Sequence, residues 1–293
     1  MRRLLIEPST FEILPIQDKQ NPYIEIKHHV NRARVAEQHE ALVQVLAKRH
    51  NGNGVIVYRL PHDIKTKLPD IVFTANGALA LPRLKESIVL LPNMKYPQRK
   101  AELPYLAAMF AALGLRTMDY PGSEPFEGQA ELKWFDGGRK AICGYGHRST
   151  RRTFEELDDL FEKIYGSADK PTLLVLPLAS ADYYHLDVAM CEYAPSGSLN
   201  ITKCLVHKRA FSAASHEKIR DFLGAENVTV IDTRDSFCLN AVIDGPTMIT
   251  HRLTDPALKP LFERLTGRRV IQVPTTEFEK SGGSVRCMTL DIF

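Results

Sequence analysis

The sequence of 293 residues has no long hydrophobic run, no paired cysteine motif and little excess of charge of one sign. No apolar segment approaches the length that crosses a bilayer, and the apolar run behind the first two arginines is too short for a secretory signal. We therefore expect no membrane partner. A net charge of +3 is also too small to indicate a nucleic-acid partner.

Cysteine usage excludes two further classes of protein. The five cysteines are an odd number, widely scattered and without CxxC spacing, so they predict neither a disulfide framework nor a zinc site. We expect a reduced, cytoplasmic protein without a bound metal. The apolar fraction of 44% and the charged fraction of 25% are typical of a globular protein. Because no proline- or glycine-rich linker divides the chain, residues 1–293 are predicted to form a single domain. A homo-oligomer is left open.

One pattern occurs five times along the chain. A helical stretch ends at a glycine, a short apolar strand follows, and a turn then presents one polar or reactive side chain. The glycines are Gly52, Gly114, Gly166, Gly224 and Gly267. The strands are Val55–Tyr58, Arg116–Tyr120, Leu173–Leu176, Val228–Asp232 and Val270–Val273. The presented side chains are Asn76, Glu127, His185, Asn240 and Cys287. A period of roughly 50 residues indicates a repeat architecture.

Each repeat is predicted to run strand, strand, helix, strand. The clearest hairpin is AELKWF-DGG-RKAICGYG, where Asp136-Gly137 forms a strong turn signal. The last segment, SVRCMTLDIF, is a strand with no helix after it, and the first, RRLLIEPS, is a strand without its partner. We expect these two segments to complete one unit together and to close a ring. Equivalent positions of the five units would then meet at one axis.

Helices are expected between the second and third strand of each unit. Thr153 stands three residues before Glu156 in a capping-box pattern, and Asp255-Pro256 is a second helix start. The remaining predicted helices are Arg32–His50, Lys100–Leu113 and Ser215–Leu223.

Two of the presented residues, together with Asp187, could carry nucleophilic chemistry. Cys287 follows Gly282 and Gly283, which allow a ligand to approach the backbone closely. His185 and Asp187 stand two residues apart, which in a strand places both side chains on one face. A carboxylate in that position can orient the imidazole or pair with a cationic ligand. The other interpretations are a small buried hydrophobe for the cysteine and a solvated turn for the histidine.

The remaining candidates are weak one by one. Glu127 in EPFEGQAE could be an ordinary loop glutamate, and Asn76 and Asp70 in PDIVFTANGALA could be turn residues. Cys143, Cys191, Cys204 and Cys238 each lie inside an apolar strand and are predicted to be structural.

Together these segments resemble a known family. The stretches PDIVFTAN, FEG, YHLD and GGSVRCMT are similar to those of the guanidino-group-modifying enzymes. This family includes arginine deiminase, dimethylarginine dimethylaminohydrolase, arginine dihydrolase and the amidinotransferases. The early NPY, here Asn21 to Tyr23, resembles the family's NPW-type segment. The family fold is the pentein, a five-bladed, pseudo-symmetric α/β propeller, which agrees with the repeat count.

The resemblance implies roles for individual residues. Cys287 would be the nucleophile and His185 the general acid and base, with Glu127 and Asp187 contacting a substrate guanidinium. Arg99 and Arg148 match positions that hold a substrate carboxylate, for which a guanidinium is well suited; the other interpretation of each is a surface ion pair. The matched segments add Asn21, Asp70, Phe73 and Asn76 to the substrate-binding residues. No cofactor and no metal is implied.

The chain departs from the family pattern at three positions. Asn76 stands where deiminases have an acid and resembles the asparagine of the arginine dihydrolases, which remove both nitrogens from the guanidine. Arg286 and Glu131 replace a common histidine and a common aspartate.

The expected function is hydrolysis of C–N bonds in the guanidino group of arginine or an arginine derivative, through a cysteine thiouronium. An amidinotransferase is the first alternative. A pentein used as a non-catalytic binding module is the second, because fold alone does not imply catalysis.

Overall fold

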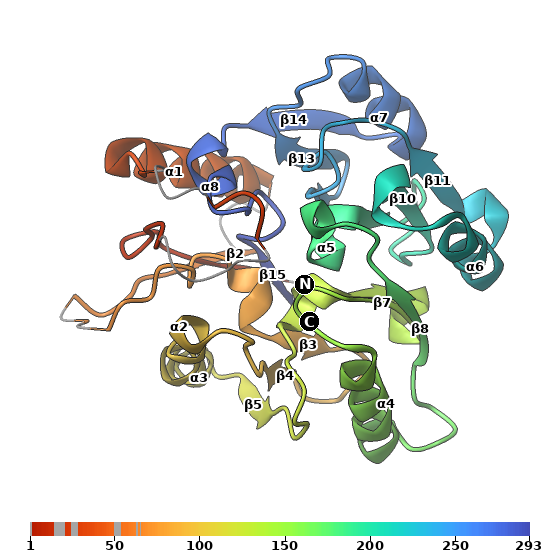
Figure 1. Ribbon diagram of the computed structural model, residues 1–293, viewed down its shortest axis with the longest axis horizontal. Helices are drawn as coiled ribbons and strands as arrows, with labels where there is room; N and C mark the ends of the chain where they lie inside the picture. The colour runs from red at the N-terminus through yellow and green to blue at the C-terminus, as the bar shows by residue number, and fades with distance from the viewer. Residues whose placement is uncertain (1, 15–20, 25–28, 50–53, 63, 65) are drawn as a thin grey trace.

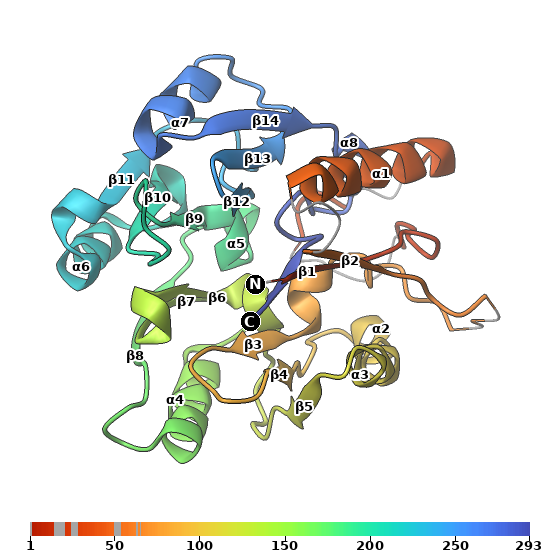
Figure 2. The ribbon, with the colours of Figure 1, turned by 180° about the vertical axis from the view of Figure 1, so that it is seen from behind.

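The computed structural model describes residues 2–14, 21–24, 29–49, 54–62, 64 and 66–293. The described residues form five three-stranded sheets around a common centre, with the long helices at the rim (Figure 1). The expected five-bladed α/β propeller is therefore confirmed. Figure 2, the view from behind, shows the same arrangement with α1, α3, α4, α6 and α7 outermost and α5 near the centre.

The described strands follow the predicted positions closely. They are β1 (Arg2–Ile6), β2 (Val55–Tyr58), β3 (Leu79–Leu81), β4 (Ile88–Leu91), β5 (Arg116–Asp119), β6 (Leu132–Phe135), β7 (Lys140–Tyr145), β8 (Thr172–Pro177), β9 (Met190–Tyr193), β10 (Lys203–His207), β11 (Val228–Ile231), β12 (Val242–Asp244), β13 (Thr247–His251), β14 (Arg269–Val273) and β15 (Leu290–Ile292).

The α-helices are of two kinds, long helices at the rim and short helical turns near the centre or beside a rim helix. They are α1 (Arg32–Arg49), α2 (Pro97–Lys100), α3 (Leu103–Ala112), α4 (Arg151–Tyr165), α5 (Leu186–Ala189), α6 (Ala213–Leu223), α7 (Leu258–Thr266) and α8 (Thr276–Glu279).

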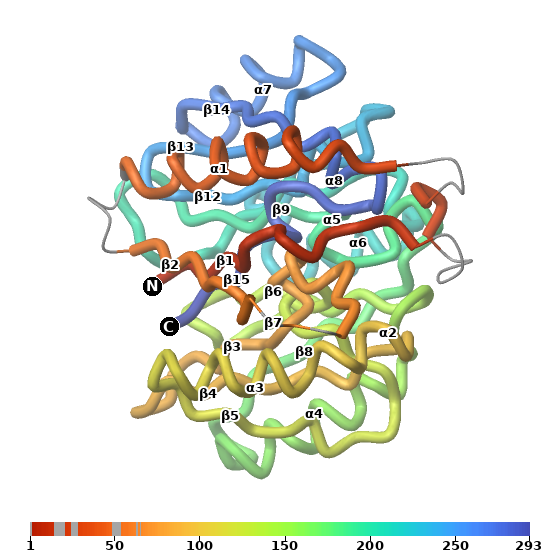
Figure 3. The backbone as a smooth tube through the Cα atoms, turned by 90° about the vertical axis from the view of Figure 1, so that its left-hand side faces the viewer, coloured from red at the N-terminus to blue at the C-terminus, as the bar shows by residue number. Residues whose placement is uncertain are grey.

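Every sheet has the same connectivity. Its first strand is antiparallel to the middle strand, and the middle strand is parallel to the third, as in the sheets β3-β4-β5 and β6-β7-β8. A rim helix makes each parallel crossover, which a parallel pair requires. The first and last strands of the chain share one sheet, because β15 pairs antiparallel with β1 from Leu4–Leu290 to Arg2–Ile292. Figure 3 shows the two chain ends next to each other. The predicted ring closure is confirmed.

Apolar residues of the rim helices pack against the sheets. In α4, Phe154, Leu157 and Phe161 are buried against Trp134 and neighbouring residues of β6 and β7. Burial of apolar area of this kind is the main favourable contribution to folding. It fixes each unit and leaves the polar turns at the inner ends of the units free to form a site.

Two predicted helix starts and one predicted continuous helix were wrong. Helix α4 begins at Arg151, because Thr150 rather than Thr153 is its N-cap and forms the capping box with Thr153. Helix α7 begins after Ala257, although the side chain of Asp255 accepts the backbone N–H of Ala257 at 2.9 Å. The predicted helix Lys100–Leu113 is split, because α2 ends at Lys100 and α3 begins at Leu103.

The glycine stops behave as predicted at four positions. Gly114, Gly166, Gly224 and Gly267 each have positive φ, a backbone conformation that glycine adopts without steric cost. Gly52 lies outside the described residues. None of the helices in the described part of the chain is long and apolar enough to cross a membrane. No group of acidic, histidine and cysteine residues suited to a metal ion was found there either.

Candidate active site

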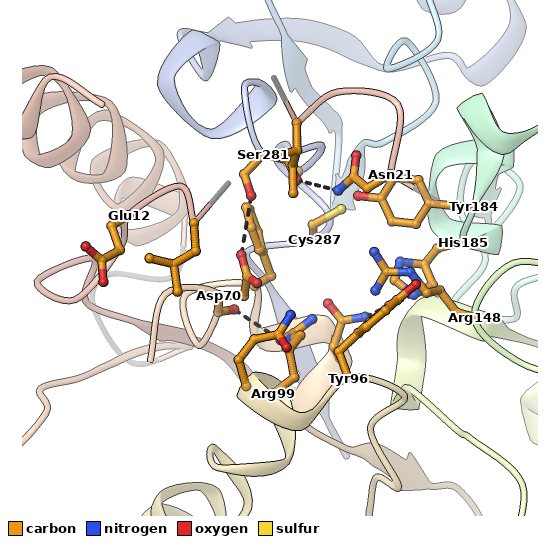
Figure 4. Close-up of a pocket in the computed structure, with 16 residues that line it drawn as sticks. Glu12, Asn21, Asp70, Tyr96, Arg99, Arg148, Tyr184, His185, Ser281 and Cys287 are labelled. Atoms are coloured by element: carbon orange, nitrogen blue, oxygen red, sulfur yellow. Dashed lines mark hydrogen bonds between the residues drawn. The ribbon is translucent and has the colours of Figure 1, made fainter. Parts of the chain in front are cut away.

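A pocket near the centre of the ring brings together residues from distant parts of the sequence (Figure 4). The side chains of Cys287, His185 and Asn76 reach it from three different units. Other pocket residues that the sequence singled out are Asn21, Asp70, Phe73, Arg99 and Arg148. Glu127 and Asp187 are fully buried beside these residues rather than in the pocket wall.

Cys287 lies in a tight turn just before β15, not inside a strand. The turn is closed by the backbone bond from Met288 N to the carbonyl of Ser284 at 3.2 Å. Gly283 precedes it, and a side chain there would collide with the ring of Phe73, so only glycine allows Phe73 to pack this closely. The thiol is 3% exposed. Burial and the negative charge of Asp187 raise the pKa of Cys287 well above its ordinary value, so the resting form is the neutral thiol.

His185 caps a short helix, and the prediction of a strand through His185 and Asp187 was wrong. His185 is the residue before α5, and Asp187 lies inside that helical turn. Nε2 of His185 lies 2.8 Å from Oε2 of Glu127 and 3.4 Å from Nδ2 of Asn76. The side chains presented by three successive units therefore meet at one imidazole nitrogen.

Both carboxylate oxygens of Glu127 accept hydrogen bonds. Its Oε2 accepts a hydrogen bond from His185 at 2.8 Å and another from Nη1 of Arg148 at 3.1 Å. Its Oε1 accepts a hydrogen bond from the backbone N–H of Lys95 at 3.3 Å. Burial alone would raise the pKa of Glu127, but the charge of Arg148 and the bond to His185 outweigh it and hold that pKa well below its usual range. Glu127 is therefore ionised at neutral pH.

Asp187 is the opposite case. It is fully buried, and apart from the adjacent thiol of Cys287 its carboxylate oxygens have no hydrogen-bond partner among the described residues. A buried charged group without a partner is costly, and proteins keep one chiefly where a ligand completes it. Its negative charge acts on the thiol of Cys287, so the two groups lie in one environment.

Two of the three departures from the family pattern, Glu131 and Arg286, have separate structural roles. Glu131 accepts the backbone N–H of Glu127 at 2.8 Å, and burial next to the charge of Glu127 raises the pKa of Glu131 to about 8. Arg286 turns away from the pocket: it pairs with Asp291 at 2.9 Å and with Glu192 at 3.2 Å. Glu131 thus supports Glu127, and Arg286 anchors the turn that carries Cys287.

Neither arginine near the pocket is a surface ion pair. Arg99 is 4% exposed and forms two bonds of 2.9 Å to the carboxylate of Glu102. The guanidinium of Arg148 lies between two aromatic rings, 5.1 Å from the centre of Tyr96 and 4.8 Å from that of Tyr184. Both positive charges face the pocket that Cys287 lines.

Two of the other predicted residues contact the loop before Cys287. Asn21 donates to the carbonyl of Ser281 at 3.0 Å, and Asp70 accepts from the hydroxyl of Ser281 at 3.3 Å. Both contacts hold the loop before Cys287 in place. The pocket is therefore lined by all of the predicted catalytic and substrate-binding residues except Glu127 and Asp187, which are fully buried.

The sequence analysis missed two aromatic residues of the site. Tyr96 and Tyr184 line the pocket, and the hydroxyl of Tyr184 donates to the carbonyl of Gly282 at 2.6 Å. Their positions in the sequence could have indicated them, because Tyr184 directly precedes His185 and Tyr96 stands three residues before Arg99. The four other cysteines are free and buried, as expected, but Cys238 lies in a turn between β11 and β12 rather than inside a strand.

The fold and the site define a class: a pentein with a cysteine, a histidine and buried acids at its centre. The model of the eukaryotic N,N-dimethylarginine dimethylhydrolase family matches residues 7–172. The chain belongs to this family.

Known proteins similar to this chain agree with that class. The bifunctional arginine dihydrolase/ornithine cyclodeaminase AgrE of Nostoc sp. is 31% identical over 277 residues, covering 93% of this chain and 35% of AgrE. An N(G),N(G)-dimethylarginine dimethylaminohydrolase of Mycobacterium tuberculosis is 28% identical over 232 residues, covering 77% of this chain and 67% of that protein. The chain thus spans about a third of the length of AgrE.

Solved structures show the same fold. The product-bound N-terminal domain of ArgZ, a cyanobacterial arginine dihydrolase, superposes with a TM-score of 0.81 at 28% identity, covering 99% of this chain and 96% of that one. A dimethylarginine dimethylaminohydrolase adduct superposes with a TM-score of 0.71 at 18% identity, which shows the fold alone.

Proposed function

We propose that this protein is a hydrolase that breaks C–N bonds in the guanidino group of arginine or an arginine derivative. Cys287 is the nucleophile, His185 carries protons, and a thiouronium on Cys287 is the intermediate. The product is a urea-type compound plus ammonia or an amine. A second round on the same carbon would leave the bare amine.

The observation that carries this proposal is the unpartnered carboxylate of Asp187 next to a buried thiol. A buried anion is stabilised by a bound cation, and a thiol beside it can react with an electrophilic carbon of that ligand. A guanidinium supplies both in one group. Its planar N–H groups suit a carboxylate, and its central carbon is the point of attack.

The free site is not reactive by itself, because the pKa of Cys287 is raised. A bound guanidinium places positive charge beside the sulfur, which favours the thiolate. The thiol proton passes to His185, and the sulfur forms a bond to the central carbon. The C–N bond breaks as the departing amine takes the proton from His185. Holding carbon and sulfur together makes this attack effectively unimolecular.

The second half of the reaction uses the same groups in reverse. His185 removes a proton from water, and the resulting hydroxide adds to the central carbon. The S–C bond breaks, its electron pair returns to the sulfur, and the product leaves. Ionised Glu127 keeps the imidazole in place through its 2.8 Å contact with Nε2. No metal or organic cofactor takes part in these steps.

Arg99 and Arg148 are proposed to bind the carboxylate end of the substrate. Both line the pocket and both are positively charged. In the free protein Arg148 contacts Glu127. When a substrate carboxylate enters the pocket, Arg148 can contact that carboxylate instead. The names of AgrE and ArgZ, and a solved ArgZ domain covalently bound to a reaction intermediate at 27% identity, support this substrate class.

The test is a panel of guanidines: arginine, mono- and dimethylarginine, and agmatine, with products identified by mass. We expect citrulline and one ammonia from a single hydrolysis, or ornithine, carbon dioxide and two ammonia from a double one. Both must form without an added acceptor amine, which separates a hydrolase from an amidinotransferase.

Cys287→Ser is expected to lower turnover by several orders of magnitude while the protein stays folded. Cys204→Ala, which removes a buried thiol of β10, is the matched control and should keep its activity. Equal loss in both variants, or full turnover in Cys287→Ser, would contradict the proposal.

A further inference from the structure

Asn240 is a presented side chain that has no role in the mechanism above. It is fully buried and follows the turn between β11 and β12. Its Nδ2 lies 3.1 Å from Sγ of Cys287 and donates to it. The same nitrogen donates to the backbone carbonyl of Asp187 at 3.1 Å.

The orientation of the amide follows from its other end. Oδ1 of Asn240 faces two backbone N–H groups, that of Arg286 at 2.9 Å and that of Cys287 at 3.3 Å. Backbone N–H groups can only donate, so the atom facing them must be the oxygen. The NH2 group is thereby fixed on the side of the sulfur. A flipped amide would direct the NH2 group of Asn240 at the two backbone N–H groups, and donors cannot hydrogen-bond to one another.

We propose that Asn240 is a further catalytic residue, which donates a hydrogen bond to the sulfur of Cys287 and stabilises the thiolate. This inference rests on the proposed function of Cys287 as nucleophile. Asn240 holds the Cys287 backbone with its oxygen and the sulfur with its nitrogen, so one side chain both places and activates the nucleophile.

The proposed donor acts twice in each turnover. It stabilises the sulfur as the thiol loses its proton, and again when the S–C bond of the thiouronium breaks and the electron pair returns to sulfur. Hydrogen bonds to an ionised partner are stronger than neutral ones. The bond is therefore worth more to the thiolate than to the thiol, which is the requirement for a rate effect. In the free protein the negative charge of Asp187 destabilises the thiolate of Cys287, whereas a bound guanidinium neutralises that charge.

The thiol pKa of Cys287 tests this idea without reference to turnover. The rate of alkylation by iodoacetamide is followed against pH, and the Cys287 peptide is quantified by mass. Asn240→Ala removes the donor, and Asn240→Asp keeps an acceptor for the two backbone N–H groups while removing the donor. In both variants we expect the pKa of Cys287 to rise by about one to two units. We also expect kcat to fall at least roughly tenfold, with KM little changed.

Thr250→Val is the matched control. Thr250 lies in β13, and its hydroxyl donates to the carbonyl of Cys238, two residues before Asn240, at 3.4 Å. The thiol pKa should stay unchanged there. An unchanged thiol pKa in a folded Asn240→Asp, or an equal rise in Thr250→Val, would overturn the proposal. Should Cys287 prove not to be the nucleophile, the pKa would still rise in the Asn240 variants while Cys287→Ser kept its turnover, so the two failures differ.

Discussion

At the scale of single residues, the site is a contrast between two buried carboxylates. The carboxylate of Glu127 accepts from His185, Arg148 and the backbone of Lys95 and is ionised, whereas Asp187 has only the thiol of Cys287 beside it among the described residues. Glu127 holds the imidazole of His185 in place, and Asp187 is available to bind a cationic substrate group. This division could not be predicted from the sequence, where both were assigned to the substrate guanidinium.

Asp187→Asn tests the second role. Removal of an unpartnered buried charge should stabilise the free protein by about 1 to 3 kcal/mol. The same change should lower kcat/KM strongly, because the guanidinium loses its counter-charge. It should also lower the pKa of Cys287 toward its ordinary value, because the negative charge of Asp187 is one of the causes that raise it.

Urea unfolding, steady-state kinetics and the alkylation profile measure these three effects. Loss of stability in Asp187→Asn would show that Asp187 has a partner in the folded protein. Glu131→Gln provides a comparison, because the pKa of Glu131 is raised to about 8 and its protonated form already resembles an amide.

At the scale of elements, the sequence predicted strands and rim helices better than the short turns of the site. Val55–Tyr58 was predicted to the residue, because an apolar run behind a glycine is a strong strand signal. Helix α5 was missed, because a four-residue helical turn has no periodicity to read. The start of α4 was misplaced by one turn, since both Thr150 and Thr153 fit a capping pattern.

The contact between β13 and α8 makes stability depend on pH. His251 at the end of β13 lies 2.9 Å from Asp235 and 3.2 Å from Glu279. Burial alone would lower the pKa of His251, but the two carboxylates raise it to about 9. Because the folded pKa lies above the unfolded value, this stabilisation is complete below about pH 6.5 and is lost as pH rises through 9.

His251→Gln should therefore remove part of the fall in melting temperature between pH 6.5 and 9.5. The expected difference in unfolding free energy is on the order of a few kcal/mol at pH 6.5 and close to zero at the upper end. Thermal unfolding of both proteins across this range is the measurement. Parallel melting curves at every pH would contradict the assignment.

At the scale of the whole molecule, the ring is closed by its two ends. Arg3 on β1 contacts Asp291 on β15 at 3.0 Å and Asp244 on β12 at 2.8 Å. Asp291 also pairs with Arg286, which directly precedes Cys287. The repeat pattern predicted the closure of the ring. These ion pairs could not be predicted, because they join residues that only the closed ring brings together.

Arg3→Ala is expected to cost about 3 to 5 kcal/mol of unfolding free energy, because it leaves buried carboxylates short of a partner. Arg2→Ala is the matched control: Arg2 is exposed on the same strand, so a change within about 0.5 kcal/mol is expected. Urea unfolding measures both. A loss in Arg3→Ala as small as that in Arg2→Ala would show that the ring closes without these ion pairs.

The most direct test of the whole account is to look for the bond between Cys287 and substrate carbon. Protein turning over arginine or a methylated arginine is quenched with acid and digested, and the peptides are weighed. We predict an adduct on the Cys287 peptide equal to the substrate less its departing amine. Steady turnover with no adduct on that peptide, or with the adduct on another residue, would contradict the account.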